Sequence, residues 1–176
     1  MNPKEILMGF AQYGVQKTSM EDIAKRAGLS RQSIYKRFGS KDGVLEWALT
    51  SYINQVYEAG TNALKELSSC DPKQTVLTAF VHWIGDGVPL IKTTAHGAEI
   101  LDSGIKLAQE SSTDWEGDFM RMLSGFIASS GLTDSMEDAI ERSFVLHVAS
   151  KGVLLKSQTV EEFSEGMKRV IYIVFR

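Results

Sequence analysis

The sequence predicts an all-α fold of about nine helices, and three observations predict it. Apolar residues recur at intervals of three and four, the spacing of one helix face, along most of the 176-residue chain. Only three prolines interrupt this pattern, at positions 3, 72 and 89. Four segments have the capping-box pattern of a helix start, in which the first side chain accepts from an orphan amide and the fourth reaches back. They are Thr18–Glu21, Asp71–Gln74, Thr113–Glu116 and Thr159–Glu162.

The composition indicates a globular protein. Hydrophobic residues make up 43% of the chain and charged residues 23%, which is close to globular averages and excludes a disordered chain. The one cysteine, Cys70, excludes an internal disulfide and fits a reducing compartment. The sequence shows no run of about 18 apolar residues and no secretory-signal pattern at its start. We therefore expect a cytoplasmic protein.

The first element to justify is a helix, a tight turn and a second helix over residues 19–38. Gly28 follows the first helix, at the place where a left-handed residue typically ends one. Ser30 is suited to cap the second helix, and Ile34 and Phe38 would anchor it. The spacing then predicts a long helix over residues 41–68, about 42 Å at 1.5 Å per residue. That length is enough to leave one small domain and enter another.

Two further helices are predicted over residues 134–176, with a break near 156–159. Each has an apolar stripe wider than one neighbouring helix would cover, and small residues of the first permit close approach. We expect the two to form a homodimer interface; the alternative is that the stripes are core of a single chain. The expected interface residues are Phe144, Val148, Gly152, Leu155, Met167, Ile171 and Val174.

Charge is unevenly distributed along the chain. Residues 1–47 hold eight Lys and Arg against five Asp and Glu, a balance of +3, whereas residues 48–176 hold eleven against seventeen, a balance of −6. Residues 27–41 contain no acid and four cations, which are Arg31, Lys36, Arg37 and Lys41. A basic N-terminal part on an acidic remainder indicates an anionic partner for the former.

The exposed face of the helix after Gly28 carries side chains suited to DNA. They are Arg31, Gln32, Ser33, Tyr35, Lys36 and Arg37. Arg and Gln can bond bidentately to guanine and adenine edges, while Ser and Tyr hydroxyls, with Lys41 at the next helix start, suit phosphate oxygens. A helix of this width fits the major groove, and the helix before it would brace against the backbone. The alternative is a solvated helix face.

Residues 10–45 resemble the N-terminal DNA-binding segment of the tetracycline-repressor (TetR) family of bacterial transcription regulators. The matching positions are Phe10, Ala11, Gly14, Thr18, Ser19, Ile23, Ala24, Ala27, Gly28, Leu29, Ser30, Ser33, Ile34, Tyr35, Phe38, Ser40 and Lys41. The resemblance covers about a quarter of the chain. The other three quarters match only in the number and order of helices.

The resemblance implies a homodimer whose helix-turn-helix DNA-binding domain, residues 1–45, binds a palindromic operator. Residues 46–176 would form an effector-binding and dimerisation domain. By position, Thr18 and Ser19 would touch phosphate, and Arg31, Gln32 and Ser33 would face bases. Tyr35, Lys36, Arg37 and Lys41 would mostly hold the backbone.

An effector site is expected within residues 75–130. Its candidate residues are His82, Trp83, His96, Trp115, Phe119 and Met122. Aromatic and Met side chains near a few polar groups suit a largely apolar small molecule, of unspecified identity. The alternative is that these residues are ordinary core.

Catalysis is not expected from this sequence. His96 and Glu99 could share a helix face that a metal would use, but no second such pair accompanies them. The sequence has no phosphate-binding glycine motif, nucleophile elbow or zinc-spaced cysteine set. We predict no cofactor and no metal. Two hypotheses follow: a ligand-gated transcriptional repressor, or a helical small-molecule- or metal-binding protein whose basic N-terminal part is incidental.

Overall fold

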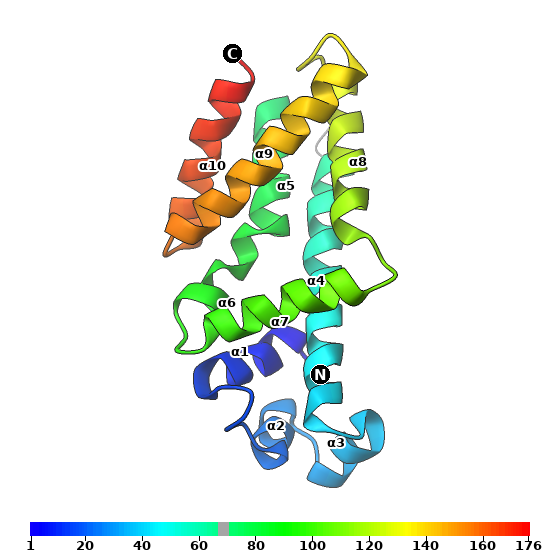
Figure 1. Cartoon of the computed structure of the whole chain (residues 1–176), viewed down its shortest axis with the longest axis vertical. Coiled ribbons are helices and arrows are strands. Elements are labelled where there is room, and N and C mark those ends of the chain that lie inside the picture. Colours follow the sequence, from blue (N-terminus) through cyan, green and yellow to red (C-terminus); the bar gives the residue numbers. More distant parts are fainter. Residues whose placement is uncertain (67–70) are drawn as a thin grey trace. The chain divides into compact units, whose positions relative to one another are not determined.

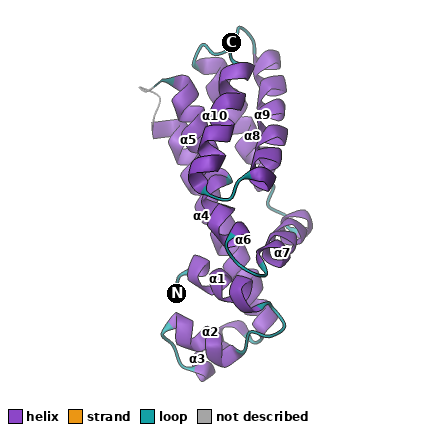
Figure 2. Ribbon diagram, turned by 90° about the vertical axis from the view of Figure 1, so that its left-hand side faces the viewer, coloured by secondary structure: helices purple, strands orange, loops and turns teal. Residues whose placement is uncertain are grey.

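The computed structural model describes residues 1–66 and 71–176, and within these residues it contains helices and no strand (Figures 1 and 2). Nine helices of eight residues or more and one short helix occupy them, so the all-α prediction is confirmed. None of these helices is long and apolar enough to span a membrane. Cys70 lies outside the described residues.

The chain divides into two compact units. Unit 1 comprises residues 1–55 and 89–113, and unit 2 comprises residues 56–88 and 114–176. The helices of unit 1 are α1 (Pro3–Tyr13), α2 (Met20–Ala27), α3 (Arg31–Phe38), α6 (Val88–Lys92, without its first residue) and α7 (Gly97–Glu110). Those of unit 2 are α5 (Pro72–Trp83), the 3₁₀ turn η1 (Gly85–Gly87), α8 (Trp115–Ser129), α9 (Met136–Lys156) and α10 (Val160–Val174). Helix α4 (Lys41–Glu66) contributes to both units.

Unit 1 has one core, to which every helix in it contributes. Phe10 of α1 and Ile34 of α3 are fully buried, as is Val44 of α4. Helix α7 adds Ile100 to this core, and the backbone N–H of His96 donates to the carbonyl of Ala11 over 2.7 Å. Because α7 packs on α1, unit 1 extends beyond the predicted domain of residues 1–45. The functional division at residue 45 stays a prediction.

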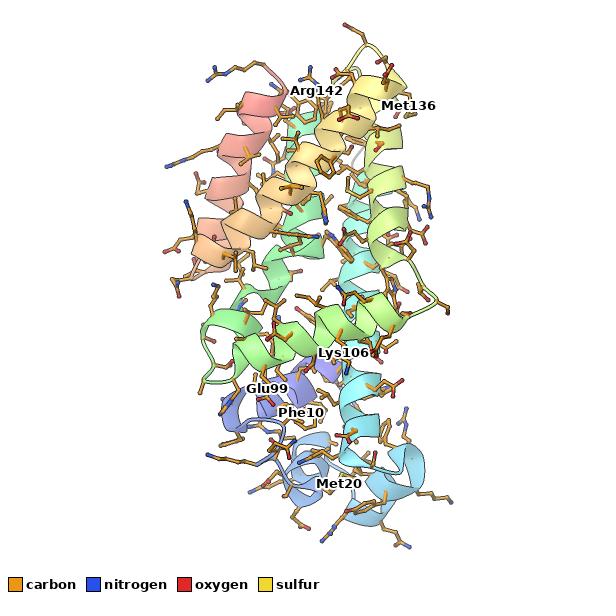
Figure 3. All side chains as sticks on the ribbon, viewed as in Figure 1. Phe10, Met20, Glu99, Lys106, Met136 and Arg142 are labelled. Atoms are coloured by element: carbon orange, nitrogen blue, oxygen red, sulfur yellow. The ribbon has the colours of Figure 1, made fainter. Side chains whose placement is uncertain are left out.

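Unit 2 is built around aromatic and aliphatic side chains of α5, α8, α9 and α10. Phe80, Phe119, Leu146 and Phe163 are each fully buried. Two cations hold the C-terminal end of α10. Lys73 Nζ donates to the carbonyl of Phe175 over 2.6 Å, and Arg142, labelled on α9 in Figure 3, donates to the carbonyl of Val174. Cations at this end of a helix satisfy orphan carbonyls and oppose the helix dipole.

Two of the four predicted helix starts are displaced by one residue. Asp71 and Thr159 cap α5 and α10 as predicted. The cap of α2 is Ser19 rather than Thr18, and that of α8 is Asp114 rather than Thr113. In α2 the reason is local. The Thr18 hydroxyl donates to the carbonyl of Gly14 over 2.7 Å, which leaves Ser19 as the residue that can pair with Asp22.

Candidate nucleic-acid interface

Helices α2 and α3 are joined by a tight turn whose geometry depends on Gly28. Its φ of 64° lies in the left-handed region, and its N–H donates to carbonyls of the last turn of α2. Two residues later, Ser30 begins α3 by accepting from the N–H of Ser33 over 3.1 Å. The helix-turn-helix prediction for residues 19–38 is therefore confirmed in its elements.

Helix α3 buries one residue and exposes most of the others. Ile34 is fully buried and Phe38 is half-buried, so these two hold the helix on unit 1. The six side chains predicted to face DNA are all exposed: Arg31, Gln32, Ser33, Tyr35, Lys36 and Arg37. Eight residues at 1.5 Å each make a rod about 12 Å long, short enough to enter a major groove along its whole length.

The guanidinium of Arg31 is held above the ring of Tyr35. The Arg31 Cζ atom lies 5.4 Å from the ring centroid, a cation–π distance. A side-chain hydrogen bond with Tyr35 is the main cause that raises the pKa of Arg31 above its ordinary value. One turn of helix separates the two residues, so the pair stays on the exposed face, where Arg31 can approach a base edge.

Arg37 and Lys41 have partners within unit 1. The Arg37 guanidinium lies 5.2 Å from the ring centroid of Phe38 and 5.8 Å from that of Trp47. Lys41 Nζ donates to the carbonyl of Gln16 over 2.9 Å. Both cations therefore connect the start of α4 to its neighbours and have to leave or share these partners to bind phosphate.

At the start of α2 the structure separates the two predicted phosphate contacts. Thr18 is 3% exposed and its hydroxyl is used inside unit 1, so the predicted contact from the Thr18 side chain is corrected to a structural role. Ser19 is exposed, and its hydroxyl donates to Asp22 Oδ2 over 2.6 Å. Hydrogen bonds from the Ser19 side chain and backbone lower the pKa of Asp22.

The sequence did not single out a pocket beside this helix start. It is lined by Tyr13, Lys17, Asp22, Lys25 and Arg26. Their only signal in the sequence is the excess of cations over residues 1–47, because the lysines belong to no motif. Three cations around one anion indicate a site for negatively charged ligands.

The predicted effector residues are divided between the two units. His96 belongs to unit 1, and the other five belong to unit 2. Within unit 2, Trp83 stacks on Phe119 with ring centroids 5.1 Å apart. Met122 lines a different feature, a surface pocket of about 300 Å³. His82 Nδ1 lies 3.0 Å from Asp86 Oδ2, and Trp115 is buried. The effector site itself stays a prediction.

Helices α8 and α9 share a partly buried charge cluster. His147 is 5% exposed, and its Nε2 lies 2.9 Å from Glu116 Oε1; Lys151 Nζ lies 3.1 Å from Glu116 Oε2. Burial lowers the pKa of His147, and the attraction of Glu116 offsets this only in part. Burial acts to raise the pKa of Glu116, but His147 and Lys151 together outweigh it, so that this pKa is lowered.

The free energy of unfolding is expected to fall as the pH drops below about 6.5, the ordinary pKa of His. There the unfolded chain binds a proton that the folded chain, with its lowered His147 pKa, does not bind. One proton accounts for at most about 1.4 kcal/mol per pH unit. Urea unfolding between pH 7.5 and 5.5 measures this loss, which H147Q should reduce. The control is H82Q, at a half-buried His on α5. Equal pH dependence in the native chain and H147Q would contradict the assignment.

Helix α9 exposes a row of apolar side chains. Met136, Ile140, Phe144, Val148 and Leu155 are each at least 51% exposed and are spaced by four or seven residues, so they share one face. A Cβ placed on Gly152 would meet no atom within 4 Å. These observations fit the four interface residues predicted on α9.

Two of the three interface residues predicted on α10 are corrected. Met167 is fully buried and Ile171 is 1% exposed, so both belong to the core of unit 2. Val174 is half-buried. The exposed apolar residues of α10 are instead Tyr172, at 50%, and Ile173, at 61%. A partner could therefore reach the opposite face of α10 from the one predicted.

Comparison with known proteins connects this geometry to a family. Residues 6–48 match the family model described as bacterial regulatory proteins, tetR family. Among solved structures, the TetR-family transcriptional regulator PfmR from Thermus thermophilus is 19% identical with a TM-score of 0.62, over 99% of this chain and 96% of that one. A protein from Mesorhizobium loti is 16% identical with a TM-score of 0.68, over 98% and 94%. A TetR transcriptional regulator from Legionella pneumophila is 16% identical with a TM-score of 0.61, over 100% and 98%. The search of curated proteins found no match.

Proposed function

The chain is a regulator of the TetR family, and from this premise we propose that it binds a palindromic operator as a homodimer and represses transcription until a small molecule releases it. The observation that carries the proposal is the exposed face of α3. Six side chains suited to base edges and phosphates lie on a short helix that is anchored from its other side by Ile34. Such a helix enters the major groove.

We assign the side chains of α3 and its surroundings to two roles. Arg31, Gln32 and Ser33, at the N-terminal end of the helix, read bases. The side chains that hold the DNA backbone are Ser19, Tyr35, Lys36, Arg37 and Lys41. Thr18 is left out because its side chain is buried.

The homodimer follows from the operator's symmetry. Two half-sites separated by one helical turn, about 34–36 Å, need two recognition helices, and therefore two chains. The row of exposed apolar residues on α9 offers a surface for the second copy, because an exposed apolar row of this kind is otherwise unfavourable in water. Tyr172 and Ile173 would extend that surface onto α10.

Release by a small molecule requires that the molecule bind one spacing of the two heads more tightly than another. We propose that this effector is largely apolar and binds within the body of the protein, where Trp83 and Phe119 stack. The proposal assigns the chain no catalytic step, cofactor or metal, and places it in the cytoplasm with the DNA.

Binding of the purified protein to DNA from upstream of its own gene tests the proposal. We expect specific affinity to fall steeply with salt, with a log–log slope of about −0.9 for each phosphate neutralised. Selection of bound fragments from the source genome would then give the half-site spacing. A chain that binds this DNA no better than unrelated duplexes would instead support a helical small-molecule- or metal-binding protein.

A further inference from the structure

The pocket between α1 and α2 is the strongest site that the proposed function does not use. Its lining side chains come from the end of α1, the turn after it and one face of α2; they are Tyr13, Lys17, Asp22, Lys25 and Arg26. All five are exposed, so a ligand can reach them without any opening of unit 1. With three cations and one carboxylate, the pocket has a formal charge of +2.

Arg26 is fixed in place before any ligand arrives. Its Nη2 donates to Gln12 Oε1 over 2.7 Å, and its Cζ lies 5.7 Å from the ring centroid of Tyr13. The absence of a side chain at Gly9 makes this position available, because a Cβ there would come within 2.8 Å of Arg26 Cδ and Nε. The guanidinium is thus held across α1 at little further cost in side-chain entropy.

The one carboxylate of the pocket is largely occupied. Asp22 Oδ2 accepts from the N–H and the hydroxyl of Ser19, over 3.0 and 2.6 Å. Its negative charge is therefore directed to the start of α2 rather than to the lysines. Lys17 and Lys25 are the groups left to bind an incoming anion, with Arg26 fixed beside them.

The position of α2 identifies the anion. In a helix-turn-helix, the helix before the recognition helix crosses the DNA backbone. We propose that the α1–α2 pocket binds a phosphodiester of the operator backbone outside the base pairs read by α3. Lys17 and Lys25 would contact the phosphate oxygens, and Arg26 and Tyr13 would hold the pocket open. This inference rests on the proposed function and adds one phosphate contact per head.

The test compares the salt dependence of operator binding for the native chain and the double variant K17A/K25A. The loss of one phosphate per head, two per dimer, should reduce the log–log slope by about 1.8. Between 50 and 200 mM salt, the native protein should therefore lose about 12-fold more affinity than the variant. Base preference should not change. The matched control is K106A/K168A, which removes the same charge at exposed lysines of α7 and α10 and should leave the slope unaltered.

A second arm shortens the duplex. When the base pairs flanking the half-sites are removed, the native chain and K17A/K25A should reach the same slope. Equal slopes on the full-length duplex would overturn the pocket assignment while leaving specific operator binding, and so the proposed function, in place. Absence of specific binding by the native chain would overturn both. If inorganic phosphate shifts amide resonances of α2 in the native chain but not in the variant, while both slopes agree, the pocket is a site for free phosphate and the duplex assignment is wrong.

Discussion

The double substitution F144D/V148D is expected to convert the homodimer into monomers and to lower operator affinity by about 1,000-fold or more. Phe144 and Val148 lie one turn apart in the middle of the exposed row on α9, at 60% and 52% exposure. Two carboxylates per chain would meet two more across the twofold axis, and each would lose water without a partner. A monomer has one recognition helix, so its binding should approach the non-specific level, at least about 10³-fold weaker than specific binding.

Light scattering after size-exclusion chromatography measures the mass, and a gel shift measures the affinity. The control is I105D, which places a carboxylate on an apolar residue of α7 that is 48% exposed. That variant should remain dimeric. Because both α9 positions are exposed in the single chain, the double variant should keep the helix content of the native protein. A dimeric F144D/V148D protein that binds the operator normally would contradict the α9 interface.

The second large effect is expected from R31A/Q32A, which should abolish the preference for the operator over other duplexes. A bidentate contact is worth about 1–3 kcal/mol of discrimination, and a dimer makes four such contacts with these two residues. Their combined loss of at least about 4 kcal/mol corresponds to about 1,000-fold. Both side chains are exposed, so stability should change little.

Competition binding with the operator and a scrambled duplex of equal length measures this preference. The comparison variant is K36A, which should weaken binding to both duplexes alike and lower the salt slope, since Lys36 is assigned to phosphate. Specific binding that survives R31A/Q32A would show that α3 is not the recognition helix, or that other residues read the bases.

The sequence by itself determined the elements whose causes are local. Gly28 ends α2 because it adopts a left-handed conformation at no steric cost, and Ser30 begins α3 because its hydroxyl reaches an amide three residues on. The exposed face of α3 follows from its one buried residue, Ile34, since helical spacing then places the other side chains outward. These signals lie within a few residues of one another, so they predicted the candidate recognition helix directly.

Only the tertiary structure decided which neighbour covers each apolar face and which partner each charge finds. The stripe on α10 could be predicted to be buried, but the packing of α10 on α5 and α9 places Met167 and Ile171 in the core and leaves Tyr172 and Ile173 exposed. In the same way, Lys41 binds a carbonyl 25 residues earlier in the chain. Helical periodicity specifies which residues share a face and contains no information about the distant segment that meets it.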